Sequence, residues 1–289
     1  MFDFRYHALS LVAVFLALVV GLLLGVAIGD KGLVSGAEKD LRSSLRHDVV
    51  QARADAADAR RSLTDREQLE ARDFYPIMVA DRLSGARVGI VAFGSVPDAY
   101  VDEVRTALDP TGGRLVSVSV IREPPDLKPL AAAAKGTRYA KLGRKPGLLG
   151  RFGVKIGRQF RVGGKFLAAM RPALLSQGRS SGTLDGLEGV VLVHSRADSE
   201  DPAARKRVDA FEAGVVKGLT GQGARVVGVE DTEQDPSSVP WFKRMGLSSV
   251  DDVNLVEGRT ALIYALTGET GTFGVKSSAS ALLPTVVSR

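Results

Sequence analysis

The sequence predicts an α/β fold with an N-terminal transmembrane helix, a long helical (coiled-coil) stalk, and a small, mainly parallel sheet flanked by helices. Three observations predict it: an uncharged run at residues 8–29, a polar, alanine-rich stretch without proline at 33–75, and β-branched runs alternating with amphipathic segments from residue 85. The expected parts are a short leader (1–7), the transmembrane helix (8–29), the stalk (30–76), an α/β domain (85–268) with a basic insertion (127–184), and a flexible tail (269–289).

The transmembrane helix is predicted from 22 residues that include neither a charge nor a proline. At about 1.5 Å per residue such a helix covers roughly 30 Å, the thickness of the hydrocarbon core of a bilayer. Small residues recur at every fourth position and would let two helices approach closely: Ala13, Ala17, Gly21, Gly25 and Gly29. Two alternatives stay open: a signal peptide cleaved near Ala27, and small residues that only reflect ordinary membrane-helix composition.

The stalk is predicted from helix-favouring residues between Leu33 and Tyr75, and Pro76 is expected to end it. Apolar residues recur there at alternating spacings of four and three, which is typical of a coiled-coil seam: Leu45, Val49, Ala52, Ala56, Ala59 and Leu63. A stalk that is helical throughout would span roughly 60 Å and hold the next domain away from the membrane. The alternative is a single solvated helix without a partner.

The α/β domain is predicted from strand and helix patterns that alternate. A buried strand at Arg87–Phe93, a helix from Pro97 to Leu108 and a strand at Leu115–Ile121 form a β–α–β unit, which favours parallel pairing. The remaining expected elements are a strand at 187–193, a helix capped by Asp201 and begun by Pro202, a strand at 224–229 and a helix at 257–266. The sheet should therefore have about four strands.

Charge is distributed unevenly along the chain. The net charge is +6, but residues 127–184 hold thirteen Lys or Arg and no acid, which leaves 26 basic and 33 acidic residues elsewhere, a net charge of −7. Phenylalanines are interleaved with these cations, so one interpretation is an amphipathic contact with anionic lipid or an acidic envelope polymer. The residues expected to make it are Lys141, Arg144, Lys145, Arg151, Lys155, Arg158, Arg161 and Lys165. The alternative is a mobile, glycine-rich surface insertion; nucleic acid is not expected as a partner of a membrane-anchored domain.

The first 25 residues carry a family resemblance. A short polar leader and the helix that follows are similar to the amino terminus of the mycobacterial copper transport protein B family of actinobacteria. The matching residues are Arg5, Tyr6, His7, Val12, Ala13, Val14, Phe15, Leu16, Ala17, Leu18, Gly21 and Gly25, and the segment 258–268 is similar as well. The resemblance implies an envelope protein, linked to copper export or tolerance, with its bulk outside the cytoplasmic membrane. Lys31, Lys39 and the next basic residues favour the opposite orientation by the positive-inside rule; we follow the resemblance.

Sequence motifs for catalysis are absent. There is no Walker A loop and no G-x-S-x-G elbow. One group stands at the carboxyl end of a predicted strand, where open α/β sheets bind ligands: His194, Ser195, Arg196 and Asp198. Because adjacent side chains on a strand point to opposite faces, the first two are not expected to act as a pair. We therefore predict no catalytic and no cofactor-binding residue.

Copper ligands are equally sparse. The chain has no cysteine, and its three histidines (His7, His47 and His194) fall in the leader, the stalk and a strand end. Cu(I) prefers sulfur ligands and Cu(II) prefers clustered imidazoles, so we predict no metal site and no cofactor within one chain. The expected protein is a non-enzymatic, membrane-anchored homodimer whose domain docks on an envelope or transport partner. The alternatives are a scaffold for envelope assembly or division, and an enzyme with its site near His194.

Overall fold

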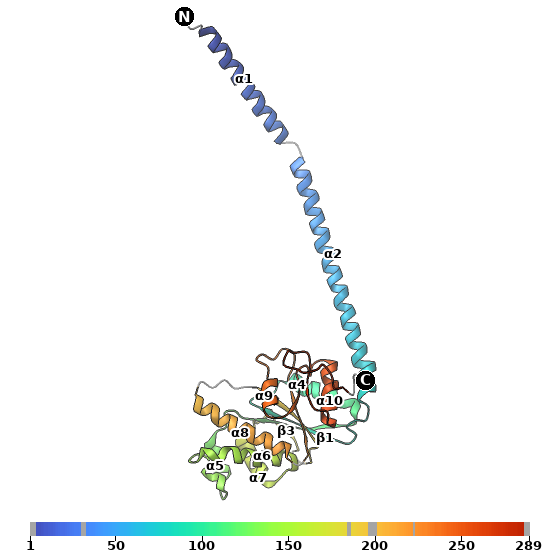
Figure 1. The fold of residues 1–289 in the computed structure, drawn as a ribbon, viewed down its shortest axis with the longest axis vertical. Coiled ribbons are helices and arrows are strands. Elements are labelled where there is room, and N and C mark those ends of the chain that lie inside the picture. The colour runs from blue at the N-terminus through green and yellow to red at the C-terminus, as the bar shows by residue number, and fades with distance from the viewer. Residues whose placement is uncertain (1–3, 30–32, 184–185, 196–200, 222, 286–289) are drawn as a thin grey trace. The chain divides into compact units, whose positions relative to one another are not determined.

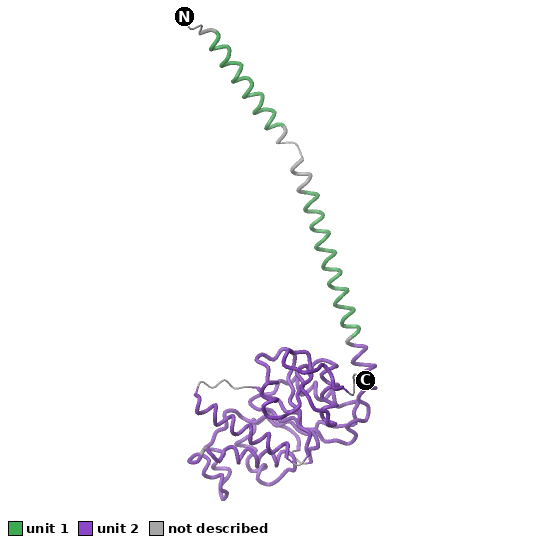
Figure 2. Tube along the Cα trace, viewed as in Figure 1, with its two compact units in different colours: residues 1–66 green, residues 67–289 purple. Residues whose placement is uncertain are grey.

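The computed structural model describes residues 4–29, 33–183, 186–195, 201–221 and 223–285. The chain divides into two units, residues 1–66 and 67–289, which Figure 2 colours separately. The predicted α/β class is confirmed: an apolar N-terminal helix precedes a mainly parallel sheet flanked by helices. Arg196 and Asp198, two of the predicted strand-end residues, lie outside the described residues.

Two helices make up most of the first unit. Helix α1 (Phe4–Gly29) takes in the end of the predicted leader, and its segment Tyr6–Ala27 is long and apolar enough to cross a membrane. Among the predicted packing residues, an added Cβ at Gly21 or Gly25 meets nothing within 4 Å. Helix α2 (Leu33–Leu69) is continuous through the predicted stalk, and the six seam residues on it are exposed. A coiled coil therefore stays a prediction, because only one chain is present.

The sequence predicted that the stalk ends at Pro76, but the helical path continues past this residue. One π-helical turn, η1 (Glu70–Phe74), leads into the short helix α3 (Tyr75–Val79), whose first turn contains Pro76. A proline is tolerated there because a first-turn residue needs no N–H partner within the helix. The hydroxyl of buried Tyr75 donates a hydrogen bond to the Ala107 carbonyl (2.6 Å), so α3 belongs to the α/β unit.

The sheet has seven strands in the order β3-β2-β1-β4-β5-β6-β7, and every pairing is parallel except β2 with β3. The strands are β1 (Arg87–Phe93), β2 (Arg114–Ile121), β3 (Ser181–Gly182), β4 (Gly189–His194), β5 (Arg225–Val229), β6 (Ser248–Val250) and β7 (Thr272–Phe273). The four predicted strands are β1, β2, β4 and β5. The other three are only two or three residues long, which is too short for a periodicity to show.

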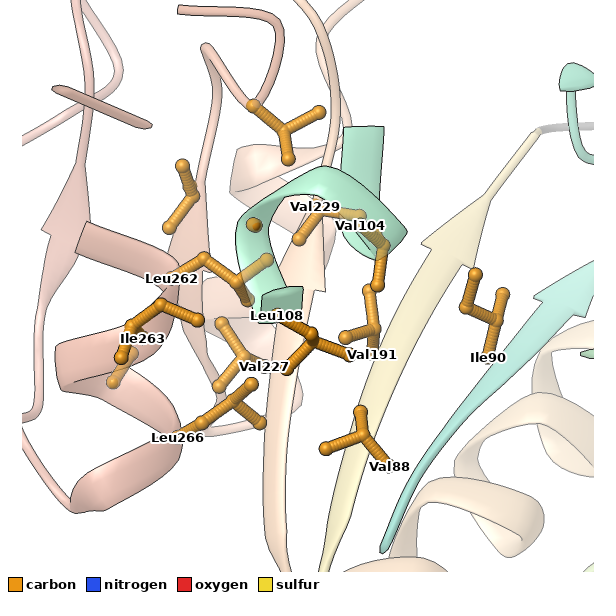
Figure 3. Packing of buried hydrophobic residues seen from close by; sticks show 14 of the residues in the cluster. Val88, Ile90, Val104, Leu108, Val191, Val227, Val229, Leu262, Ile263 and Leu266 are labelled. Atoms are coloured by element: carbon orange, nitrogen blue, oxygen red, sulfur yellow. The ribbon is translucent and has the colours of Figure 1, made fainter. Parts of the chain in front are cut away.

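Helices cover both faces of the sheet (Figure 1). They are α4 (Asp98–Leu108), α5 (Leu127–Ala133), α6 (Leu149–Val162), α7 (Lys165–Leu174), α8 (Pro202–Thr220), α9 (Val239–Arg244) and α10 (Val256–Thr267). On one face α4 and α10 pack on the sheet; Figure 3 shows Val104, Leu108 and Leu262 against Val191 and Val227. On the other face α5 to α9 bury a second cluster rich in phenylalanine. Successive residues of a strand point to opposite faces of the sheet, so their side chains contribute alternately to the two clusters, as expected for a sheet buried on both sides.

The described part of the basic segment, residues 127–183, belongs to this second layer, and the alternative of a mobile, glycine-rich surface insertion is wrong. Phe152 and Phe160 are fully buried, so they are not available for lipid either. The glycines of α6 serve close packing: a Cβ added to Gly153 or Gly157 would lie 2.5 Å or 2.1 Å from a backbone oxygen of α8. Two helices that touch through backbone need glycine at the contact. The glycines of α6 are therefore explained by this crossing.

The prediction of a flexible tail after Gly268 also needs correction. Residues 272–273 form strand β7 beside β6, and the chain beyond is tied to the sheet. Half-buried Lys276 forms an ion pair with buried Glu230 (2.8 Å), and the Val275 and Lys276 amides donate to Asp251 Oδ1. These ties join residues 24 to 46 positions apart, so local composition could not reveal them.

Candidate functional site

The strand order places a topological switch point between β1 and β4. From β1 the chain passes to β2 on one side, and the strands from β4 to β7 lie on the other side. In open α/β sheets ligands bind outside the carboxyl ends of the strands at such a point, because the connections diverge there. In this protein the residues at that place are Gly94 and Ser95 after β1 and Ser195 after β4.

A cleft of about 310 Å³ opens at these strand ends. It is lined by Pro97 and Tyr100 after β1, Ser195 after β4, and Asp231, Glu233, Gln234, Asp235 and Pro236 after β5. Gly94 shapes the turn that leads into it: its φ is +79°, and an added Cβ would lie 2.9 Å from the Ser195 carbonyl oxygen. The Ser95 hydroxyl donates to Ser195 Oγ (3.1 Å), which joins the two strand ends. The close contact between the backbone after β1 and the backbone after β4 therefore shapes the cleft at the switch point.

The cleft is acidic. Its described lining holds three carboxylates, those of Asp231, Glu233 and Asp235, and no Lys or Arg. Asp231 Oδ1 is already occupied, because it accepts the backbone amides of Glu233 (3.0 Å) and Gln234 (2.8 Å). Burial raises the pKa of Tyr100, so its hydroxyl remains protonated and donates to Gln234 Oε1 (3.2 Å). The negative charge of the cleft can therefore attract a cationic group, but Asp231 Oδ1 already accepts two backbone amides and is less available to bind it.

Beneath the cleft lies a buried network around His194. Its Nε2 lies 3.2 Å from Glu212 Oε1, its Nδ1 lies 3.2 Å from Ser238 Oγ, and its ring stacks on Trp241 at 4.2 Å. Contacts of this kind occur in nucleophile triads, but here the Ser238 hydroxyl also bonds the His194 backbone carbonyl (2.9 Å) and all three polar side chains are buried. The arrangement fixes the loop after β5 to the end of β4.

Glu123, which follows β2, lies beside this network. Burial, and then the charge of Glu212, raises the pKa of Glu123. Glu123 therefore keeps its proton at neutral pH, because a charged carboxylate is costly to bury in the interior.

A second polar network lies at the carboxyl ends of β5 to β7. Glu230, which is fully buried, accepts from Lys276 Nζ (2.8 Å) and from Ser237 Oγ (2.7 Å), and Lys276 also donates to the Gln234 carbonyl (2.8 Å). Beside it, burial raises the pKa of Asp252 to about 7, and the Asp251 charge adds to the shift. These residues hold the floor of the cleft through Gln234. No sequence motif indicated them.

The predicted strand-end pair separates as expected. His194 is buried and contacts Glu212, whereas Ser195 lines the cleft. Of the eight residues predicted to form a basic surface, all are exposed except Arg161, which is half-buried. Most of them lie on η3 (Arg138–Lys141), the following turn and α6. Lys155 lies over the ring of half-buried Phe166 at 4.9 Å. Whether this surface binds an anion remains a prediction.

Copper donors are not brought together in the described residues. No group of three or more His, Cys, Asp or Glu there is arranged to hold a metal. His7 and His47 are exposed on α1 and α2, and His194 is engaged in the interior. Among the methionines, Met170 is buried in the second cluster, while Met78 and Met245 pack against the two clusters. Within the ranges that the structure describes, these donors therefore form no group of the kind that copper prefers, and whether the protein binds copper stays a prediction.

Together these features define a class: an α/β protein with a doubly wound sheet and a small acidic cleft, preceded by a helix able to cross a membrane. Comparison with protein families matches residues 1–124 and 165–284 to the family described as copper transport outer membrane protein, MctB. The match spans most of the chain, so the chain belongs to this family and is a copper transport-related envelope protein. No curated protein matches the chain.

The unmatched stretch coincides with the basic surface. Residues 125–164 fall between the two matched parts, and they include every predicted anion-contacting residue except Lys165. The strands that build the cleft, in contrast, lie within the matched parts. The family match therefore covers the strands of the cleft but not most of the basic surface.

Proposed function

We propose that this protein is a single-pass membrane protein whose α/β unit lies outside the cytoplasmic membrane and serves copper transport without catalysis. In this proposal the α/β unit docks on envelope or transport machinery, and the metal is carried elsewhere. One observation carries it: the chain belongs to a copper transport family, yet its own described residues offer no fitting copper donor set.

The strand ends support a non-enzymatic role. The groups that a catalytic site would need are occupied in structural contacts: Ser238 bonds a backbone carbonyl, and His194 bonds Glu212 and stacks on Trp241. Ser195, which is in the cleft, contacts Ser95 rather than a base. A nucleophile without a base to activate it reacts slowly.

The two helices of the first unit support the anchoring part. Helix α1 contains a 22-residue apolar segment of the length that a bilayer needs. The same helix carries the small-residue face, and α2 carries the seam, so we expect the chain to form a homodimer through both. The side chains of the basic surface would then be free to contact an anionic envelope component.

The test has two measurements on the intact chain. In spheroplasts of the native host, added protease should remove the α/β unit and leave a short fragment that contains α1. The chain purified in detergent and incubated with Cu(I) or Cu(II) should retain no stoichiometric metal after gel filtration, as measured by mass spectrometry. Full protection from protease overturns the orientation, and one tightly held copper per chain overturns the docking role.

A second candidate is a scaffold for envelope assembly or division without a metal role. The missing copper donor set favours it as much as it favours docking. Deleting the gene for this protein in the native host distinguishes the docking role from the scaffold role. Copper docking predicts reduced growth only when copper is raised, whereas the scaffold predicts altered cell shape or separation at ordinary copper.

A further inference from the structure

Helix α2 exposes apolar side chains that no part of its own described chain covers. Leu45, Val49 and Leu63 are 54%, 48% and 60% exposed. They lie on one continuous helix, which breaks the α-helical pattern only at the π-helical turn that starts at Glu70. The seam from Leu45 to Leu63 is therefore uninterrupted and covers roughly 28 Å of helix.

Charges flank this seam in an ordered way. If Val49, Ala56 and Leu63 are heptad positions a, then Asp48 and Asp55 take positions g on one flank, and Arg53 and Arg60 take positions e on the other. None of these four side chains makes a hydrogen bond or ion pair within the described residues, and all are exposed. The outer face differs, because Arg61 there pairs with Asp58 of the same helix (3.2 Å).

We propose that α2 binds a second copy of itself as a parallel, in-register coiled coil held by ion pairs along the seam. In that arrangement each g residue faces the e residue five positions later on the other copy, so Asp48 meets Arg53 of the second copy and Asp55 meets Arg60 of the second copy. An antiparallel pair would instead place e against e and g against g, arginine against arginine and aspartate against aspartate. The charges thus select the parallel orientation.

The parallel orientation agrees with the membrane anchor, and in this respect the inference rests on the proposed function: two chains with the same topology present their stalks side by side. Three of the six seam residues are alanines, which bury little surface, so the stalk alone should associate weakly. Anchors in one membrane raise the effective concentration of the stalks and make a weak seam sufficient. The ion pairs supply orientation and partner choice more than strength.

Cysteine crosslinking tests orientation directly, because the natural chain has no cysteine. Leu45→Cys and Leu63→Cys place one thiol near either end of the seam; Ser44→Cys and Thr64→Cys are neighbours on the outer face. After diamide oxidation of membranes from the expressing cells, each seam variant should form at least fivefold more disulfide dimer than its outer-face neighbour. Equal yields overturn the proposal. Crosslinking only when Leu45→Cys and Leu63→Cys are mixed means an antiparallel pair and overturns it too.

Charge reversal tests the ion pairs. In the Leu45→Cys background, Asp48→Arg with Asp55→Arg should lower the dimer yield at least fivefold, and Arg53→Asp with Arg60→Asp should do the same. Co-expression of the two reversed chains should restore at least half of the original yield as heterodimer. A yield that none of the reversals changes refutes the ion pairs. The crosslinking and charge-reversal measurements do not depend on copper. A chain that retains copper, or an α/β unit that is protected from protease, would therefore overturn the proposed function but not the parallel coiled coil.

Discussion

The crossing of α6 and α8 gives the sharpest prediction about stability. A Cβ added at Gly157 would lie 2.1 Å from the Val215 carbonyl oxygen, 2.9 Å from Gly218 Cα and 2.9 Å from the Leu219 amide nitrogen. All three obstacles are backbone atoms, so no side chain can rotate away. Gly157→Ala must therefore push the two helices apart by about 1 Å to reach an ordinary contact distance.

The cost follows from what the crossing holds together. Phe152 and Phe160 of α6 and Phe211 of α8 are fully buried beside it, and they lose contact when the helices separate. Overpacking of this kind costs about 1–3 kcal/mol, sometimes more, and rigid obstacles place it at the upper end. The higher helix propensity of alanine returns about 1 kcal/mol. The expected net loss is about 2 kcal/mol of unfolding free energy, or about 4–8 °C in Tm for a unit of this size.

The single tryptophan provides the assay. Trp241 is 7% exposed and stacks on His194 in the same layer, so its emission reports unfolding of the α/β unit and not of α1 or α2. Thermal unfolding of the full chain in detergent should show the lowered Tm. Gly143→Ala is the control, because an added Cβ there meets nothing within 4 Å, and it should leave Tm within about 1 °C of the natural chain.

A double variant decides whether the helix crossing is the cause. A Cβ at Gly218 would lie 2.3 Å from the Val154 carbonyl oxygen, on the other side of the same contact. Once one alanine has separated the helices, the second should cost less, so the combined loss should fall short of the sum by at least about 0.5 kcal/mol. A natural Tm for Gly157→Ala, or losses that simply add, would refute the reasoning.

Three further predictions concern pH, the basic surface and the anchor. Burial raises the pKa of Asp252 to about 7, above its value of about 3.9 in an unfolded chain, so the folded state binds this proton more tightly, and the stability it contributes is present below about pH 4 and lost as pH rises through 7. Relative to the natural chain, Asp252→Asn should therefore gain about 2.6 kcal/mol of unfolding free energy as the pH rises from 5 to 8. Denaturation profiles of the two chains that stay parallel over that range argue against it. The α/β unit, released from the chain by protease, should float with anionic liposomes, and Lys155→Glu with Arg158→Glu should weaken this binding. Adding 0.5 M salt should weaken the binding of the natural sequence in the same way. Binding that resists salt would indicate insertion into the bilayer rather than attraction between charges. Gly21→Ile should lower α1 self-association in a membrane reporter several-fold, with Leu22→Ile as the matched control, and equal signals would remove the small-residue face.

Much of the architecture followed from local patterns. The charge-free run at residues 8–29 predicted α1, and the β-branched run Arg87–Phe93 was found as β1 with the same bounds. Asp201 caps α8 as its side chain predicted, by accepting the Ala203 amide (2.9 Å). These features depend on residues close in sequence, where composition, periodicity and capping act directly.

The errors share the opposite property. Pro76 marked an expected end, but the π-helical turn before it lets the helical path continue into α3, which docks on Ala107. Lys276 was assigned to a flexible tail, yet its partner Glu230 lies 46 positions earlier. Residues in such pairs carry no local signal, because each is explained only by the other.

The sequence alone determined the apolar N-terminal helix, the long helix α2, the parallel β–α–β core and the absence of cysteine, since each depends on residue type and spacing. Only the tertiary structure decided the fate of the basic segment: the facing glycines of α6 and α8 exist as a contact only after the chain has folded, and that contact turns an apparent surface insertion into a buried layer. The same holds for the acidic cleft, which forms where three strand ends distant in sequence meet.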